Sequence, residues 1–362
     1  MTDREIAIFA AKQFNSDEII SIEPYGEGHI NTTWLAVHKN ADGVETKNLL
    51  QKINHYVFKN PAELMENIVG VTSFLKDKVP EDGTLTVIPT HDGKNYFHDE
   101  FDNYWRVYKF VENATAYQKI ENEKDFYTCG VAFGEFQQFL ADYPAEKLHE
   151  TIVNFHNTPS RFADFHKALD ADVKGRAKDV NAENDFVLAR ECKADAITSK
   201  LASGEIPYRV THNDTKLNNI LIDDATGKAK CVIDLDTIMP GAVAYDFGDC
   251  VRFGASTGAE DETDLSKIEV DLHLFEVFTN GFVSTANKFL TPAEKDSLVT
   301  GAYLMTLECG VRFLTDYLNG DVYFKIHREN HNLDRCRTQF KLVADMEAKE
   351  AKMREIVNSI EG

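Results

Sequence analysis

The pattern of apolar residues changes character near residues 110–113, and this change constrains the fold more than any other feature of the chain. Before it, short segments rich in β-branched and aromatic residues alternate with turn signals such as Asp42-Gly43 and Asp92-Gly93. From Asp125 onward, apolar residues recur mainly at helical spacing. A sheet and a helical layer each bury one face, so we predict an α+β chain with two lobes. The β-rich lobe would cover 1–112 and the mainly helical lobe 113–362.

The same patterns predict the individual elements. We expect a short amphipathic helix at the N-terminus, then strands at 32–37, 48–53, 84–89, 96–99 and 105–111. A helix that begins at Pro61 is expected within this sheet. In the second lobe we expect helices at 126–139, 159–171, 183–202, 297–318 and 338–360. Two short apolar strands, at 208–214 and 229–236, should interrupt them.

Length, charge and cysteine usage narrow the class of protein. The chain has 362 residues, which is long for one hydrophobic core, and a formal net charge of -21. That charge argues against nucleic acid and anionic membrane surfaces as partners, and no protein partner is implied. The six cysteines form no CxxC pair, and the N-terminal segment does not resemble a signal peptide. We therefore expect a cytoplasmic location.

One segment carries an inventory suited to phosphoryl transfer. It reads Thr211-His-Asn-Asp-Thr-Lys-Leu-Asn-Asn219 and lies between two short apolar strands. Asp214 would orient the attacking hydroxyl and accept its proton. Asn219 and a second acid, Asp234, would hold Mg²⁺ against the phosphates of ATP. The structural alternative is a turn rich in Asp and Asn followed by a strand that ends in Asp.

The order HxDxxxxN, then an apolar strand that ends in Asp, resembles the aminoglycoside phosphotransferase branch of the protein-kinase-like fold. The resemblance implies a bilobal kinase-like architecture with Asp214 as catalytic base. Asn219 and Asp234 would be the metal ligands, with ATP and Mg²⁺ as cofactors. His212 would brace the loop, and Asp246 would cap its backbone. Asp236 stands where related sequences have glycine, and either a metal contact or a turn cap would explain it.

The resemblance also places the nucleotide in the first lobe. Gly26 and Gly28 would belong to a loop that covers the phosphates, although an ordinary hairpin turn explains them too. A third glycine is absent, because Asn31 takes its place. The hinge at Phe110 and Glu112 would contact the adenine edge through its backbone.

The lysine of the third strand is the largest departure from the family pattern. The inward position falls on Gln51 or Lys52, and a shift of one residue reverses the side chain. If Gln51 points inward, another cation must replace the lysine. Glu63 or Glu66 of the next helix would be its partner acid or an ordinary surface carboxylate. Ile22 would cover the adenine or belong to the core.

Longer stretches resemble the N-acetylhexosamine 1-kinases of bifidobacterial type. They are residues 23–33, 105–110, 209–221, 233–241, 246–249, 252–257 and 308–314. This resemblance implies transfer to the anomeric C1 hydroxyl of GlcNAc or GalNAc, a small sugar. It places His29, Arg312 and Tyr323 around the sugar, with Phe253 in the same region.

Other interpretations remain open. Arg312 is also spaced four residues from both Glu308 and Asp316, which suits an ion-pair ladder on a helix surface. A kinase of the same fold for an aminoglycoside, choline or homoserine is the second hypothesis. The third is a nucleotide-binding pseudokinase without turnover.

Overall fold

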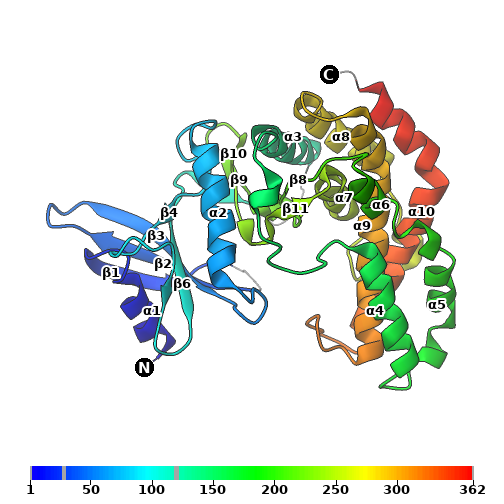
Figure 1. Ribbon diagram of the computed structural model, residues 1–362, viewed down its shortest axis with the longest axis horizontal. Coiled ribbons are helices and arrows are strands. Elements are labelled where there is room, and N and C mark those ends of the chain that lie inside the picture. The colour runs from blue at the N-terminus through cyan, green and yellow to red at the C-terminus, as the bar shows by residue number, and fades with distance from the viewer. Residues whose placement is uncertain (1, 27–29, 118–121, 361–362) are drawn as a thin grey trace. The chain divides into compact units, whose positions relative to one another are not determined.

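The computed structural model describes residues 2–26, 30–117 and 122–360, and the chain forms two compact units (Figure 1). The first unit consists of Met1–Ala116, Glu146–Val153 and Leu221–Met239. The second consists of Tyr117–Ala145, Asn154–Ile220 and Pro240–Gly362. The chain thus returns to the first unit twice after leaving it. The apolar pattern of the sequence changes only once and gives no sign of these returns.

An antiparallel sheet with strand order β1-β2-β3-β6-β4 dominates the first unit, and β5 pairs with β6 at its edge. The strands are β1 (Glu18–Pro24), β2 (Thr32–Lys39), β3 (Glu45–Ile53), β4 (Val87–Ile88), β5 (Phe97–His98) and β6 (Tyr104–Lys109). Helix α1 (Asp3–Ala11) covers one face of this sheet. The core between them contains Ala7, Ala10, Ile22, Trp34, Leu50, Trp105 and Val107.

The register between β3 and β6 decides which side chains share a face. Gln51 lies opposite Arg106, and Lys52 lies opposite Trp105. Because neighbouring residues of a strand point to opposite faces, Arg106 and Tyr108 lie on one face and Trp105 on the other. Trp105 belongs to the core under α1. Gln51 therefore shares the face of Arg106, on the side away from α1.

Helix α2 (Pro61–Lys76) ties the returning segments to the first unit. The side chain of its N-cap, Asn60, accepts a hydrogen bond from the backbone N–H of Glu63. Pro61 at the first helical position lacks the backbone N–H that would otherwise be left without a partner there. The buried side chain of Asn67 donates to the carbonyls of His149 (2.8 Å) and Ile238 (3.0 Å). A smaller sheet in the order β10-β9-β7 completes the unit. Its strands are β7 (Ala114–Ala116), β9 (Ile220–Asp223) and β10 (Ala229–Val232).

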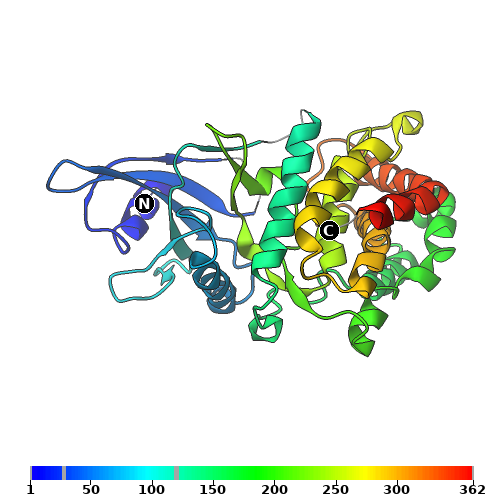
Figure 2. The ribbon, with the colours of Figure 1, turned by 90° about the horizontal axis from the view of Figure 1, so that it is seen from above.

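The second unit is mainly helical, and α3 packs along α8 in both views (Figures 1 and 2). Its α-helices are α3 (Glu123–Phe139), α4 (Thr158–Ala171), α5 (Asn181–Leu188), α6 (Thr198–Ser203), α7 (Val243–Gly254), α8 (Leu272–Ala286), α9 (Pro292–Asn319) and α10 (His331–Ser359). Short strands β8 (Arg209–Thr211) and β11 (Met239–Gly241) pair with each other. The 3₁₀ turns of the two units are η1 (Ala145–Lys147), η2 (Ala177–Asp179), η3 (Glu191–Lys193), η4 (Leu217–Asn219), η5 (Leu235–Thr237) and η6 (Leu265–Lys267).

Glycines allow α7 and α9 to cross with their backbones in contact. A Cβ atom added to Gly301 would lie 2.0 Å from the carbonyl oxygen of Ala244. One added to Gly248 would lie 2.5 Å from the carbonyl carbon of Gly301. No side chain fits at either position without moving a helix. The position of α7 is therefore fixed by its packing on the long, apolar α9.

The predicted α+β class is confirmed, with a sheet in the N-terminal region and helices in the C-terminal part. Several boundaries differ from expectation. The helix expected at 183–202 is broken between α5 and α6. There the guanidinium of Arg190 donates to the carbonyl of Phe186 (3.0 Å) in the last turn of α5 and also ion-pairs with Glu347. A long-range contact thus stabilises a helix end that local spacing could not reveal.

Other differences are smaller. Helix α10 begins at His331, earlier than expected, and β4 contains only two of the residues expected for its strand. Helix α9 ends at Asn319, one residue after the expected end at 318, and Gly320 caps it with φ of 94°. Among the residues that the structure describes, no helix combines the length and apolar character needed to cross a membrane.

We expect Gly301→Ala to destabilise the second unit, because the new methyl group would collide with the backbone of α7. Overpacking of this kind typically costs about 1–3 kcal/mol. Urea unfolding followed by circular dichroism would measure it. Glu276→Ala on the exposed face of α8 is the control and should change the unfolding free energy by less than about 0.5 kcal/mol. Equal stability of the two variants would contradict the tight crossing.

Candidate active site

The loop between β8 and β9 is fixed by one buried carboxylate, that of Asp246 in α7. Asp246 accepts hydrogen bonds from the backbone N–H groups of His212 (2.9 Å) and Asn213 (2.8 Å). Its third donor is the side-chain amide of Gln137, 2.5 Å away. Burial raises the pKa of Asp246, although these donors favour the ionised form. The carboxylate caps the loop that contains Asp214, which is the structural role that the sequence indicated.

Further hydrogen bonds fix the same loop. The Thr215 hydroxyl donates to the carbonyl of Asp246 (2.6 Å), and the Cys250 thiol donates to the carbonyl of Thr215 (3.1 Å). The ring of His212 is fully buried, and its Nδ1 accepts the N–H of Asp214 (3.3 Å). His212 therefore braces the loop, as predicted.

Asp214, Lys216 and Asn219 come together on this loop. The Nζ of Lys216 lies 2.5 Å from Oδ1 of Asp214. The amide nitrogen of Asn219 donates to the carbonyl of Asp214 (2.7 Å) and to its Oδ2 (3.2 Å). No described residue donates to Oδ1 of Asn219, and an amide oxygen in this situation suits a magnesium ligand.

The charges of this cluster keep Asp214 ionised. Burial alone would raise the pKa of Asp214, but the ammonium of Lys216 outweighs that effect, and the pKa lies below its ordinary value. Burial would lower the pKa of Lys216, yet Asp214 and Asp249 hold it above its ordinary value. Sequence reasoning missed Lys216, although its position two residues after Asp214 was a usable signal.

Asp234 lies in the first unit, directly before the short turn η5. Its backbone has φ of 57°, a left-handed conformation that is uncommon outside glycine and asparagine. Asp236 is buried and accepts hydrogen bonds from Asn31 (2.5 Å) and from Nη1 of Arg106 (2.5 Å). An ion pair with Arg106 was not among the explanations that the sequence suggested for Asp236.

The predicted nucleotide residues of β1 and β3 do not share one face of the sheet. Gln51 donates to the hydroxyl of Thr33 (3.0 Å) and accepts from Nε of Arg106 (2.9 Å). Ile22 is fully buried in the core under α1, which matches the alternative of a core isoleucine. Lys52 lies opposite Trp105, on the face away from Gln51.

Of the remaining nucleotide candidates, Gly26 follows the end of β1, and Phe110 and Glu112 follow the end of β6. Gly26 has φ of 75°, and open space surrounds the position of a Cβ atom there. Gly28 lies outside the described residues. The ring of Phe110 contacts that of Tyr25 edge to face, with centroids 5.8 Å apart. The exposed carboxylate of Glu112 pairs with Lys47 (3.1 Å).

Aromatic rings lie around Arg312 in α9, and one of them belongs to the acceptor candidate Tyr323. Its guanidinium carbon lies 5.9 Å from the ring centroids of Phe155 and Tyr323 and 5.5 Å from that of Phe324. Tyr323 is exposed. Phe253 is also exposed, near the end of α7, and His29 lies outside the described residues.

The ion-pair ladder considered for Arg312 is not what the structure shows. Asp316 is buried and accepts the backbone N–H groups of residues 322–324. Glu308 is buried and accepts from the hydroxyl of Thr158 (2.8 Å). Neither carboxylate forms a salt bridge with Arg312 within the described part of the chain.

A buried histidine links Glu308 to the loop that contains Asp214. Nδ1 of His156 lies 3.1 Å from a carboxylate oxygen of Glu308, and Nε2 lies 3.1 Å from the carbonyl oxygen of Asn213. Both partners are acceptors, so both ring nitrogens must donate and the imidazole is protonated. Burial opposes the charge, but Glu308 outweighs it and raises the pKa of His156. No sequence signal joins residues so far apart in the chain.

Arg161 in α4 adds a second guanidinium to this region. Its Nη2 donates to the carbonyl of Phe155 (2.8 Å), while its buried Nε finds no hydrogen-bond partner in the part of the chain that the structure describes. Burial lowers the pKa of Arg161, and the like charge of Arg312 lowers it further. Two guanidiniums therefore face one buried carboxylate, Glu308, whose pKa lies below its ordinary value despite its burial.

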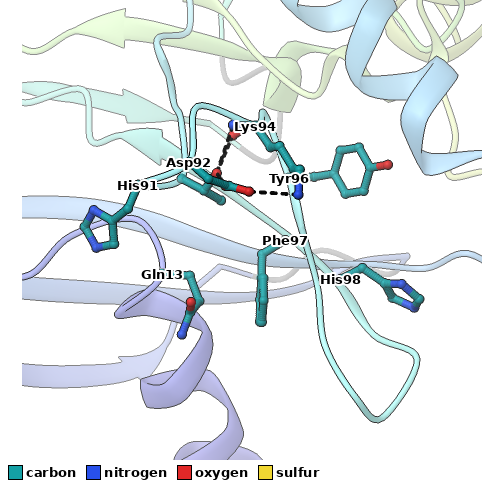
Figure 3. Close-up of a pocket in the computed structure, with 8 residues that line it drawn as sticks. Gln13, His91, Asp92, Lys94, Tyr96, Phe97 and His98 are labelled. Atoms are coloured by element: carbon teal, nitrogen blue, oxygen red, sulfur yellow. Dashed lines mark hydrogen bonds and ion pairs between the residues drawn. The ribbon is translucent and has the colours of Figure 1, made fainter.

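A pocket elsewhere in the first unit lacks comparable chemistry (Figure 3). It has a volume of about 360 Å³ and lies between α1 and the segment before β6. Its charged groups neutralise each other, because Lys94 pairs with Asp92 (2.8 Å). Thr90 also donates to Asp92 (2.5 Å). Its lining residues are Gln13, Thr90, His91, Asp92, Lys94, Tyr96, Phe97 and His98.

Comparison with known proteins identifies the family. The model of the phosphotransferase enzyme family that includes the aminoglycoside phosphotransferases matches residues 21–269, more than half of the chain. The chain belongs to this family. In this phosphotransferase, the loop with Asp214 that Asp246 caps lies within the matched residues. The kinase-like fold inferred from the HxDxxxxN motif is thereby confirmed.

Solved structures agree with this assignment. An aminopropanol kinase associated with a microcompartment is 18% identical, with a TM-score of 0.61 and coverage of 97% of this chain and 98% of its own. An aminoglycoside phosphotransferase from Alicyclobacillus acidocaldarius is 11% identical, with a TM-score of 0.63 and coverage of 98% and 96%. An amicoumacin kinase bound to AMP-PNP, Ca²⁺ and amicoumacin is 13% identical, with a TM-score of 0.58 and coverage of 99% and 94%. At these identities the similarity shows the fold of this phosphotransferase and not its acceptor.

We expect the pair of His156 and Glu308 to stabilise the protein most between about pH 4.5 and 6.5. The pKa of Glu308 is lowered from 4.5, so its contribution is present above that pH and is lost as pH falls through the folded value. The pKa of His156 is raised from 6.5, so its contribution is complete below that pH and is lost as pH rises through the folded value.

Urea unfolding of the native chain and His156→Gln across pH 4 to 9 would test this expectation. The difference in unfolding free energy should be greatest in the acidic window and should shrink at alkaline pH. His166→Gln, which removes an exposed histidine paired with Glu191, is the matched control and should show little pH dependence. A difference that is constant with pH would contradict a protonated His156.

Proposed function

We propose that this phosphotransferase transfers the γ-phosphoryl group of ATP to the anomeric C1 hydroxyl of an N-acetylhexosamine, GlcNAc or GalNAc. The observation that carries the proposal is the group of Asp214, Lys216 and Asn219 on a loop capped by Asp246. The family assignment supports phosphoryl transfer. The resemblance of seven stretches to N-acetylhexosamine 1-kinases supports the acceptor.

The chemistry begins with Asp214. Its lowered pKa means that the carboxylate is ionised when an acceptor arrives, so it can hold the hydroxyl by a hydrogen bond. The transition state of phosphoryl transfer is loose, and the proton need move only late, so positioning contributes more than base strength. An anomeric hydroxyl is more acidic than an ordinary alcohol, which favours a carboxylate base.

Lys216 would neutralise charge on the transferred group. Its Nζ is already beside Asp214, at 2.5 Å, and its raised pKa keeps it protonated. A cation that is positioned before the reaction stabilises developing negative charge at little reorganisation cost. Lys216 therefore joins the proposed catalytic residues, although the sequence alone did not indicate it.

Asn219 and Asp234 are the proposed ligands of Mg²⁺. One amide oxygen and one carboxylate are donors that Mg²⁺ accepts, and nucleotide phosphates and water normally complete its shell. The absence of a cluster of three or more His, Cys, Asp or Glu ligands among the described residues agrees with such a shared site. The ion, when bound, would neutralise charge on the phosphates.

We further propose that residues 1–112 hold the nucleotide and residues 113–362 carry the catalytic loop and the acceptor site. Gly26 and Gly28 would approach the phosphates, with Phe110 and Glu112 at the adenine edge. The relative with bound AMP-PNP has the same fold, which supports ATP as donor.

The acceptor site would contain Arg312 and Tyr323, with His29 and Phe253 nearby. The aromatic rings around Arg312 provide an apolar wall, and the guanidinium of Arg312 provides hydrogen-bond donors for sugar oxygens. Arg161 adds positive charge beside Arg312. Two guanidiniums would repel an ammonium group, which favours a neutral acetamido sugar over an amine.

The second candidate is a kinase for an amino alcohol or aminoglycoside. The aminopropanol kinase and the aminoglycoside phosphotransferase named above have the same fold. The net charge of -21 would attract such cationic acceptors over long distances. The local positive charge at Arg312 opposes this candidate.

We expect Asp214→Asn to lower kcat by at least about 10²-fold, because the amide cannot accept the proton of the acceptor. The fold and Mg-ATP affinity should change little. A coupled ADP-release assay with GlcNAc and GalNAc would measure turnover, with circular dichroism as the folding control. Asp223→Asn, on β9 and away from the capped loop, is the matched substitution that should retain activity. Near-native turnover of Asp214→Asn would contradict the mechanism.

We expect the native chain to phosphorylate GlcNAc and GalNAc but not choline, homoserine, 1-amino-2-propanol or kanamycin. Phosphorus NMR should place the phosphate on C1. Arg312→Gln should raise KM for the sugar about tenfold or more and leave KM for ATP unchanged, since a charged hydrogen bond contributes about 1.5–3 kcal/mol. Arg354→Gln, at a pair with Glu350 on α10, is the control.

Each result of the acceptor panel has a distinct meaning. Turnover only with amines would support the second candidate and overturn the sugar assignment. A folded chain that binds Mg-ATP but shows no turnover with any acceptor would favour the nucleotide-binding pseudokinase.

A further inference from the structure

The third strand of the first unit does not supply a lysine to the face where one is expected. Gln51 occupies that face, opposite Arg106, and Lys52 points toward the other face with Trp105. A kinase-like site needs a cation there to hold the nucleotide phosphates. The structure brings one to the same face from the neighbouring strand, because Arg106 lies directly across from Gln51.

Arg106 is held rigidly by two different partners. Its Nη1 donates to Asp236 at 2.5 Å, and its Nε donates to Oε1 of Gln51 at 2.9 Å. Only 2% of the side chain of Arg106 is exposed. Burial disfavours the charge, but Asp236, together with Asp234, outweighs it and raises the pKa of Arg106. The guanidinium is therefore a fixed positive charge beside the proposed metal ligand Asp234.

The contacts of Arg106 leave part of its hydrogen-bonding capacity unused. A guanidinium has five N–H groups, and the described residues accept only from Nε and Nη1. The hydroxyl of Tyr108 is buried on the same face and has no hydrogen-bond partner among the described residues. The guanidinium carbon of Arg106 lies 5.2 Å from the Tyr108 ring. Buried polar groups are rarely left unpaired, so the Tyr108 hydroxyl beside the partly used guanidinium indicates a polar ligand at this face.

The acid that pairs with the cation also differs from the one used in protein kinases. Protein kinases pair the strand-three lysine with a glutamate of the following helix. Here Glu66 of α2 instead lies 2.7 Å from Nε2 of His149. The acid that pairs with the cation is Asp236, at a position where related sequences have glycine. A new cation and a new acid therefore replace the lysine and the glutamate together.

We propose that Arg106 is the cation that binds a phosphate oxygen of the nucleotide in place of the strand-three lysine, with Gln51 and Asp236 as the residues that position it. This inference depends on the proposed function, because it assumes that the first unit binds ATP. The free N–H groups of the guanidinium contact the phosphate, and Asp236 keeps the side chain extended. The hydroxyl of Tyr108 provides a further donor on the same face.

A purely structural ion pair would explain the geometry less well. Removing two charges from water costs several kcal/mol per ion. The attraction within the pair offsets this cost only when the remaining hydrogen-bonding groups of both side chains also have partners. On this face the buried hydroxyl of Tyr108 leaves that condition unmet among the described residues. A bound phosphate would complete it and would separate the negative charges of Asp234 and Asp236 from those of the nucleotide.

Binding measurements on the full chain separate these explanations. Calorimetry would give affinities for Mg-ADP, AMP and adenosine in the native chain, Arg106→Gln, Arg106→Lys and the double variant Gln51→Lys with Arg106→Gln. We expect Arg106→Gln to lose about 10- to 100-fold in affinity for Mg-ADP and less than about twofold for adenosine. Lysine at position 51 should restore most of the loss, because it returns the cation to the same face.

A matched control removes another buried arginine. Arg209 pairs with the buried Glu294 in the second unit at 2.9 Å. Arg209→Gln should lower thermal stability while keeping the native ratio of Mg-ADP to adenosine affinity. If Arg106→Gln fails to fold, Arg106→Lys provides the same comparison, since it keeps the charge but loses the bond geometry of the guanidinium.

The outcomes are distinguishable. If the native chain does not bind Mg-ADP, the proposed function and this inference both fail. If the native chain binds it and Arg106→Gln binds equally well, only the inference is overturned. Equal losses for Mg-ADP and adenosine, without rescue by Gln51→Lys, would assign Arg106 a structural role and would also overturn the proposal.

Discussion

The hydrogen bonds between Asp246 and the backbone of the loop that contains Asp214 are the constraint on which the candidate site depends. Asp246 accepts two consecutive backbone N–H groups, those of His212 and Asn213, which forces the chain into the sharp turn that precedes Asp214. Asn213 has φ of 64°, a left-handed conformation that asparagine adopts more readily than most residues. The cap and the contacts of His212, Thr215 and Asn219 together fix the position of Asp214.

The cap in turn depends on helix packing. Asp246 lies on α7, and α7 contacts α9 so closely that only glycine fits at Gly248 and Gly301. A displacement of α7 by a fraction of an ångström would lengthen both capping bonds. The close crossing of the two helices therefore positions the Asp246 cap, and the cap in turn positions Asp214. From the other side, His156 connects α9 to the carbonyl of Asn213.

Charge in this acidic protein is arranged in compensated groups. Asp214 is paired with Lys216, and Asp236 with Arg106. Arg161 and Arg312 reverse the balance, because the buried acid on which their charges act, Glu308, already pairs with His156. The local field around Arg312 is thus opposite in sign to the net charge of the chain. Close charges are screened less than distant ones, so this local field dominates near Arg312.

The sequence by itself determined the change from sheet to helix and the loop motif. Both are written in short-range patterns: alternation along strands, helical spacing, and the five-residue interval between Asp214 and Asn219. The roles of His212 and Asp246 also followed from the family resemblance, and the structure shows His212 bracing the loop and Asp246 capping it.

Only the tertiary structure decided which distant side chains meet. Whether Gln51 or Lys52 shares the face of Arg106 depended on the register between β3 and β6, which is set by pairing across the sheet. The pairing of His156 with Glu308 joins residues separated by more than 150 positions. Local pattern fixes the face a residue occupies on its own element. Which partner lies on the opposite element is fixed by packing, because that contact depends on where two separate elements come to rest against each other.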